Sequence, residues 1–96
     1  MIGIGVCPNW TRVAASQTDS AVAAEGSIVV FAIVCSFTSA GIVTIEEGDG
    51  STVIMTIDGA AGTTETFETP FLATRGINVT TPAGVACTVF HSNAGA

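Results

Sequence analysis

Three cysteines and one histidine are the residues of widest chemical range in this chain. A nucleophilic site would need His91 beside a serine or cysteine and an orienting acid. The sequence has no G-x-S-x-G motif, and no cysteine stands at a motif spacing from the histidine. Zinc sites use closely spaced cysteine pairs, whereas Cys7, Cys35 and Cys87 are far apart. We therefore predict a polar strand-end role for His91, and no enzyme activity, cofactor or metal site.

Acidic residues offer a second kind of site. Glu46, Glu47 and Asp49 lie together in EEGDGS, and Asp58 follows the next apolar run. Calcium takes 6–8 oxygen ligands, usually from alternating positions of one loop, and the EF-hand spacing is missing here. Paired carboxylates also serve glycosidases, which need a cleft with aromatic platforms, but this chain has one tryptophan and no tyrosine. We interpret the acidic residues as a solvent-exposed hairpin tip.

The odd number of cysteines differs from the even sets of disulfide scaffolds. Cys35 and Cys87 lie inside strand-like runs, where a free cysteine behaves as a small hydrophobic residue. We predict reduced, buried thiols, which fit assembly in a reducing cytoplasm. A Cys35–Cys87 disulfide is the alternative.

Charge excludes several classes of partner. The net charge is −6, and Arg12 and Arg75 are the only basic residues. Nucleic acid and anionic membranes are bound through several lysine or arginine contacts, so we expect neither partner. The longest apolar run, residues 28–35, is far shorter than the roughly 20 residues of a membrane span, and the first residues lack the pattern of a signal peptide.

Only 10% of the 96 residues are charged, against a usual fraction of about 25%. A monomer of this composition would expose an unusually apolar surface to water. The composition therefore favours a homo-oligomer or a larger assembly. The alternative is a monomer coated with serine, threonine and glycine, because hydroxyl groups also hydrate the face of a sheet.

The positioning elements are predicted to be strands. Residues 28–90 form short β-branched runs separated by glycine, aspartate or proline, which is typical of an all-β sandwich or barrel. We predict a single antiparallel β-sandwich, jelly-roll-like, with about seven or eight strands in residues 27–96. Residues 1–26 are predicted to be a less regular N-terminal arm, or edge strands near 11–15 and 20–24.

Alternation along these strands predicts the core. Residues 28–37 are apolar on both faces, so both faces should be covered. Val29, Phe31, Ile33, Cys35 and Phe37 are predicted to share one face of this run, and Ile28, Val30, Ala32 and Val34 the other, with one of the two faces in the core. Phe71 and Leu72 are expected to fold into the core. The other residues predicted to face inward are Val43, Ile45, Val53, Met55, Ile57, Ile77, Val79, Val85, Cys87 and Val89.

Three segments carry a resemblance to a known family. They are AGIVTIEEGDGS, a strand entering an acidic hairpin; ETPFLATRGINVTT, a Pro-Phe segment before a glycine-led strand; and VACTVFHS, a closing strand. Together they cover about half the chain and resemble small β-sandwich proteins of tailed bacteriophages that decorate or cement the capsid, or serve elsewhere in the virion. The sequence departs from the family pattern at Glu46-Glu47, where an aromatic residue is expected.

The resemblance implies a capsid decoration or cement protein of the virion. Its partner would be the major capsid protein, its oligomer a homotrimer, and its site of assembly the host cytoplasm. Another head–tail or tail structural protein is one alternative. A carbohydrate-binding β-sandwich module is another, and it would require exposed aromatic side chains on a sheet face or at loop tips.

The N-terminal segment is the candidate partner contact. Trp10 is the kind of large apolar residue that is enriched at the energetic centre of interfaces. Pro8 restricts the backbone just before it and so reduces the entropy lost on docking. We predict that Trp10, Arg12 and Val13 bind the partner. The alternative is that Trp10 closes one end of the sandwich.

Overall fold

The computed structural model of the chain describes residues 9–22, 27–48 and 52–92. Within these ranges the regular structure consists entirely of β-strands, and no helix that could cross a membrane is present. The strands are β1 (Asn9–Val13), β2 (Ser20–Val22), β3 (Ile28–Phe37), β4 (Gly41–Glu47), β5 (Val53–Gly59), β6 (Thr63–Phe67), β7 (Phe71–Ala73), β8 (Ile77–Thr80) and β9 (Val85–His91).

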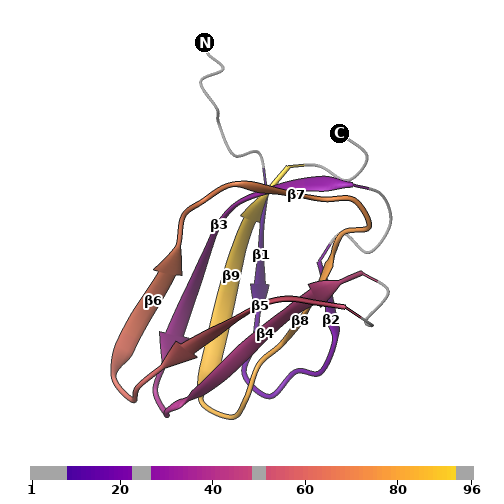
Figure 1. Cartoon of the computed structure of the whole chain (residues 1–96). Helices are drawn as coiled ribbons and strands as arrows, with labels where there is room; N and C mark the ends of the chain where they lie inside the picture. The colour runs from indigo at the N-terminus through magenta and orange to yellow at the C-terminus, as the bar shows by residue number, and fades with distance from the viewer. Residues whose placement is uncertain (1–8, 23–26, 49–51, 93–96) are drawn as a thin grey trace.

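The strands form two antiparallel sheets that pack as a sandwich (Figure 1). The five-stranded sheet has the order β1-β9-β3-β6, with β7 also paired to β3, and the four-stranded sheet has the order β2-β8-β4-β5. β6 and β7 pair with successive parts of β3, so they act as one interrupted strand. With these two counted together, the order is that of an eight-stranded jelly roll. The predicted all-β sandwich is therefore confirmed.

Each sheet takes an edge strand from the segment before β3. β1 pairs with β9 from Asn9↔His91 to Val13↔Cys87, and β2 pairs with β8. Residues 1–8 and 23–26 of the predicted arm lie outside the described residues.

The inward faces of the two sheets form one apolar core. Val43 and Ile45 of β4 meet Val85, Cys87 and Val89 of β9, and each is at most 1% exposed. The alternation of β4, β8 and β9 follows the sequence because these strands are regular and one face of each is buried. The remaining buried apolar residues are Val13, Val22, Ile28, Val30, Ile33, Cys35, Phe37, Ala73, Ile77 and Val79.

A β-bulge overturns part of the predicted face of β3. The pairing of β3 with β9 shifts register between Val30 and Ala32. An extra residue in one strand reverses the alternation on one side of it. Val30 therefore faces the core and is fully buried, whereas Val29 and Phe31, which were predicted to share a face with the buried Ile33, are only half-buried.

Two further inward predictions are wrong. Val53 is 53% exposed, because the β4–β5 pairing shifts register after Ile45 and turns the start of β5 outward. Leu72 is 63% exposed, because its neighbours in β7 occupy the inward positions. Met55 and Phe71 do face inward but are only partly buried against the core.

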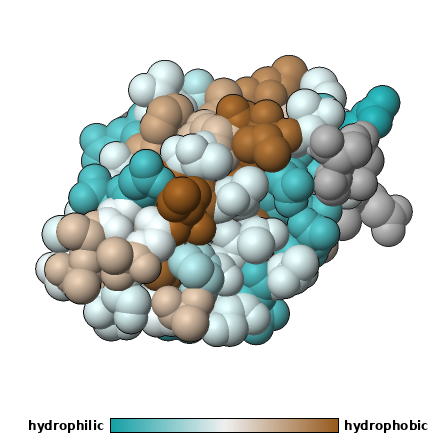
Figure 2. All heavy atoms as spheres, turned by 60° about the horizontal axis from the view of Figure 1, so that its bottom comes forward, coloured by the Kyte–Doolittle hydropathy of each residue, from teal (hydrophilic) through white to brown (hydrophobic). Residues whose placement is uncertain are grey.

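The surface reflects the scarcity of charge. In the view of Figure 2, most of the exposed atoms are pale, which marks residues of intermediate hydropathy, and brown apolar groups emerge between them. Threonine, serine, glycine and alanine separate the apolar groups, as the prediction of a hydroxyl-coated sheet allowed.

Candidate functional site

The outward-facing residues of the five-stranded sheet form one continuous surface. Cross-strand pairing places Trp10, Phe90 and Ala32 in one row. The adjacent row contains Arg12, Thr88 and Val34. We call this surface the five-strand face. Its members are Trp10, Arg12, Val29, Ala32, Val34, Ser36, Thr64, Thr66, Leu72, Ala86, Thr88 and Phe90.

Charge distinguishes this face from the rest of the chain. Arg12 is the one charged member of the five-strand face, although the whole chain carries a net charge of −6. The outward surface of the four-stranded sheet, in contrast, carries Glu46 and Asp58. The five-strand face is therefore suited to a partner that supplies a carboxylate opposite Arg12.

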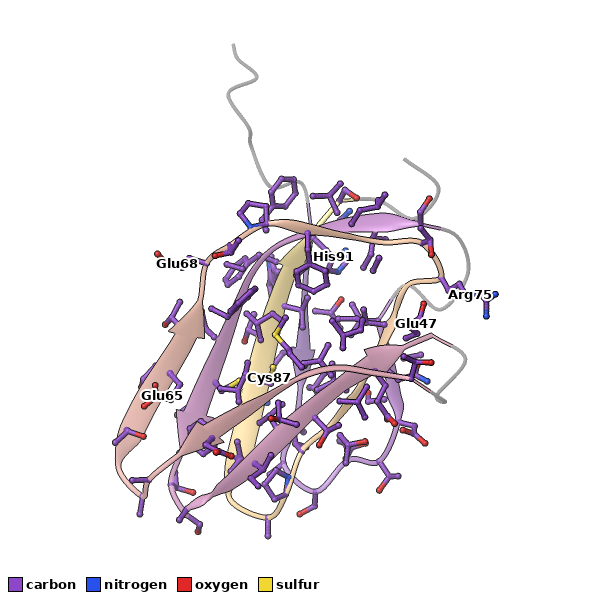
Figure 3. The ribbon with its side chains drawn as sticks, in the orientation of Figure 1. Glu47, Glu65, Glu68, Arg75, Cys87 and His91 are labelled. Atoms are coloured by element: carbon purple, nitrogen blue, oxygen red, sulfur yellow. The ribbon has the colours of Figure 1, made fainter. Side chains whose placement is uncertain are left out.

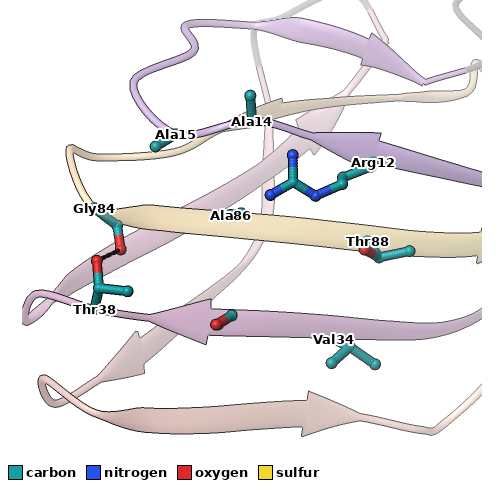
Figure 4. Close-up of a pocket in the computed structure, with 9 residues that line it drawn as sticks. Arg12, Ala14, Ala15, Val34, Thr38, Gly84, Ala86 and Thr88 are labelled. Atoms are coloured by element: carbon teal, nitrogen blue, oxygen red, sulfur yellow. Dashed lines mark hydrogen bonds between the residues drawn. The ribbon is translucent and has the colours of Figure 1, made fainter.

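A hollow of about 360 Å³ lies on the five-strand face beside the end of β1. In Figure 4 the Arg12 side chain extends along the sheet surface toward Ala14. Small side chains make up most of the wall, which lets another backbone approach closely. The lining residues are Arg12, Ala14, Ala15, Val34, Ser36, Thr38, Gly84, Ala86 and Thr88.

Hydrogen bonds hold the loops that border this hollow. Thr81, which is 3% exposed, donates its hydroxyl to the carbonyl of Ala14 at 2.7 Å and accepts a bond from the amide of Gln17 at 3.1 Å. The Thr81 amide donates to the Gln17 carbonyl. At the next turn, the Thr38 hydroxyl donates to the Gly84 carbonyl at 2.6 Å (Figure 4). The loops that border the hollow are thus held in place by polar contacts.

The structure separates the three predicted partner-binding residues. Trp10 is 67% exposed and Arg12 is also exposed, and both lie on the five-strand face. The exposure of Trp10 excludes the alternative in which it closes the sandwich. Val13 is 2% exposed and belongs to the core, because alternation along β1 turns it inward. Val13 was therefore wrongly predicted as a direct contact.

His91 lies at the end of β9, inside the sandwich (Figure 3). Its Nδ1 is 2.7 Å from the carbonyl of Ser92, which can only accept, so Nδ1 carries the proton. In the neutral ring, Nε2 then accepts the Thr11 hydroxyl at 2.9 Å. A hydroxyl, an imidazole and an orienting carbonyl resemble a nucleophilic arrangement. His91 is only 7% exposed, however, and the hollow does not include it, so the arrangement serves to satisfy buried polar atoms.

The acidic residues do not gather into a binding site in the part of the chain that the structure describes. No group of three or more histidine, cysteine, aspartate or glutamate side chains there could hold a metal ion. Glu65 and Glu68 lie along β6 and after it, and Arg75 points outward from the opposite side of the molecule (Figure 3). Asp49 lies outside the described residues.

Cys35 and Cys87 are both reduced and buried, directly opposite each other on β3 and β9. Their Sγ atoms are 3.6 Å apart, which is hydrogen-bonding distance for two thiols. The hydrogen bond with Cys35 and burial both raise the pKa of Cys87. The hydrogen bond with Cys87 lowers the pKa of Cys35, against the opposing effects of burial and of Glu65. Cys7 lies outside the described residues.

The aromatic residues are less buried than the sequence indicated. Phe37 is fully buried, but Phe67 and Phe71 are only partly buried. The rings of Phe67 and Phe71 pack edge to face, with their centroids 6.1 Å apart. Phe90 is half-buried beside the exposed Trp10. An aromatic pair therefore lies on the five-strand face, which is the feature that a carbohydrate-binding module requires.

The sequence analysis missed the hollow and the role of Thr81. Neither has a local signal, because the hollow is formed by alanines, serine and glycine from three separate segments. No protein-family model, curated protein or solved structure matches the chain.

Proposed function

We propose that this chain is a structural protein of a tailed-bacteriophage virion, a decoration or cement protein that binds the major capsid protein and stabilises the shell. The five-strand face is the proposed capsid contact, with Trp10 and Arg12 on its edge strand β1 as the main contact residues. The single observation that supports this most strongly is that Trp10 is 67% exposed on a nearly uncharged sheet face. The resemblance of the strand segments to phage β-sandwich proteins supplies the class of partner.

The mechanism is burial of apolar surface across the junctions between capsid subunits. Removing apolar surface from water contributes roughly 25 cal/mol per Å², before the costs of association are subtracted. Trp10 and Leu72, which are 67% and 63% exposed, are the most exposed large apolar side chains of the face. The small residues around the hollow let the capsid backbone approach, and Arg12 would pair with a carboxylate of the partner.

Co-sedimentation tests this proposal. Purified chain is mixed with shells assembled from the major capsid protein of the same genome, and the pellet is assayed after centrifugation. We expect saturable binding at a fixed ratio to capsid subunits, and shells that withstand higher temperature. Binding to purified tails instead of shells would show that the protein is a tail component and not a capsid decoration protein. Recovery only in the supernatant, with both particles present, would contradict a virion role.

We further propose that the protein assembles as a homotrimer. The region where β5 faces β6 leaves Met55, Ile57 and Phe67 only partly buried against the core. A neighbouring copy would complete this side of the core. Light scattering should give a trimer for the natural chain and a smaller species for Met55→Lys. A stable monomer at micromolar concentration would contradict the proposal.

A carbohydrate-binding module is the second candidate, favoured by Trp10 beside Phe90 at the sheet surface. Aromatic rings on a sheet face can stack on sugar rings. A glycan array, run with the natural chain and with Trp10→Ala, separates the candidates. Specific binding that the substitution abolishes would support the sugar-binding function, and its absence would leave the capsid as the proposed partner.

A further inference from the structure

We propose that Cys35 and Cys87 form an oxidation site in which the folded protein closes a cross-strand disulfide when it meets peroxide. This inference does not depend on the virion function. It concerns two thiols that no proposed binding surface uses.

The geometry places the two sulfurs for reaction. Cys35 and Cys87 are cross-strand partners on β3 and β9, and their Sγ atoms are 3.6 Å apart. Residues directly opposite each other on antiparallel strands have Cα atoms about 4.5–5.5 Å apart. Disulfides accept Cα separations of about 4.4–6.8 Å. The sulfurs must approach to about 2.05 Å, and this requires side-chain rotation with little movement of the strands.

The surroundings assign different roles to the two thiols. The Cys35 thiolate is stabilised by the hydrogen bond with Cys87, whereas loss of the proton from Cys87 is opposed by the same bond and by burial. The directions of the two pKa shifts favour Cys35 as the attacking sulfur and Cys87 as the resolving one. Glu65, the register partner of Cys35 on β6, disfavours the thiolate and slows the first step.

Each chemical step balances with hydrogen peroxide as the oxidant. The Cys35 thiolate attacks one peroxide oxygen, the O–O bond breaks, and the departing hydroxide takes a proton to become water. The sulfur of Cys87 then attacks the sulfenic sulfur of Cys35, and the S–O bond breaks. The hydroxide leaves with the Cys87 proton as a second water. Each sulfur loses one electron, and peroxide gains both.

Burial selects the oxidant. Cys35 and Cys87 are 0% and 1% exposed, so a reagent reaches them only through local opening of the sandwich. Peroxide is little larger than water and leaves no bulky adduct on the first sulfur. Glutathione disulfide must leave a tripeptide on Cys35 in its first step, which the packed core does not accommodate.

Trypsin provides an unambiguous measurement, because Arg12 and Arg75 are the only basic residues. Cleavage after them gives peptides 1–12, 13–75 and 76–96, which contain Cys7, Cys35 and Cys87 respectively. Folded protein is treated with hydrogen peroxide, its remaining thiols are blocked, and the unreduced digest is analysed by mass spectrometry. We expect peptides 13–75 and 76–96 to be linked, with a loss of about 2 Da. Reduction should separate them.

Variants and a stability measurement complete the test. Cys7→Ser should leave the link unchanged, whereas Cys87→Ala should leave Cys35 unlinked and carrying added oxygen. Closing a loop across a separation of 52 residues should raise Tm by about 5 °C or more. Separate peptides, a link only to peptide 1–12, or an unchanged Tm would each overturn the proposal. If Cys87→Ala fails to fold, the peptide analysis of the natural chain still tests the proposal. If glutathione disulfide formed the Cys35–Cys87 disulfide as fast as hydrogen peroxide does, the claim that the folded protein reacts would be overturned.

Discussion

Replacing Trp10 with alanine should weaken partner binding more than it weakens the fold. The side chain is 67% exposed, so about one third of its surface is already buried within the monomer. A fully buried aromatic side chain removes about 150–250 Å² from water. One third of that area, at roughly 25 cal/mol per Å², gives a folding cost of about 1–2 kcal/mol as an upper value. The remaining two thirds are available to a partner.

The binding loss follows from the same area. If the partner covers the exposed part of Trp10, about 100–170 Å² is removed, which corresponds to about 2.5–4 kcal/mol. This loss of binding free energy corresponds to an increase in Kd of about 70-fold to 900-fold. The folding cost, in contrast, should lower Tm by roughly 4–16 °C.

Both quantities are measured on the same protein. Circular dichroism gives the Tm of each variant, and co-sedimentation with capsid shells, well below that Tm, gives Kd. Ile42→Ala is the matched control, since Ile42 is 53% exposed on the opposite sheet. A large fall in Tm with unchanged binding would refute the interface role of Trp10. Equal weakening by the two variants would refute the assignment to the five-strand face.

Three further substitutions test the packing and the thiol chemistry. Gly59→Ala should lower the free energy of unfolding by about 1–3 kcal/mol, because a Cβ there would clash with the Phe37 ring; urea unfolding checks this. Thr81→Val should cost about 1–3 kcal/mol by removing the hydroxyl that joins two loops, and a Tm equal to that of the natural chain would contradict the role of this residue. Glu65→Gln should accelerate peroxide oxidation between pH 7 and pH 9, because loss of the negative charge lowers the pKa of Cys35 further and increases the thiolate fraction. An unchanged or slower rate of linking would show that Glu65 does not influence the attacking sulfur.

Regular alternation made most of the core predictable from the sequence. Val43, Ile45, Val79 and Val89 are all fully buried as predicted, since a one-residue slip would expose an entire strand face. The sequence also predicted the reduced cysteines from their strand-like surroundings. It could not show that Cys35 and Cys87 are direct neighbours, because strand order depends on contacts far apart in the chain.

The errors have a common physical cause. The bulge after Val30 in β3 and the extra residue Ile54 in β5 each change which side chains face the core. Neither position contains glycine or proline to signal the irregularity. Val13 was assigned to the interface for a different reason: the segment before β3 was interpreted without its pairing to β9. Trp10 was correctly predicted to be a surface residue, because that prediction used the enrichment of tryptophan at interfaces and did not depend on strand alternation.

The five-strand face is the central claim, and electron cryomicroscopy of decorated shells tests it most directly. Shells of the major capsid protein are saturated with the chain and reconstructed at a resolution that separates strands. We predict that the β1-β9-β3-β6 sheet lies against the capsid, with Trp10 and Arg12 at the contact. Density in which that sheet faces solvent, or shells that carry no additional density, would contradict the account.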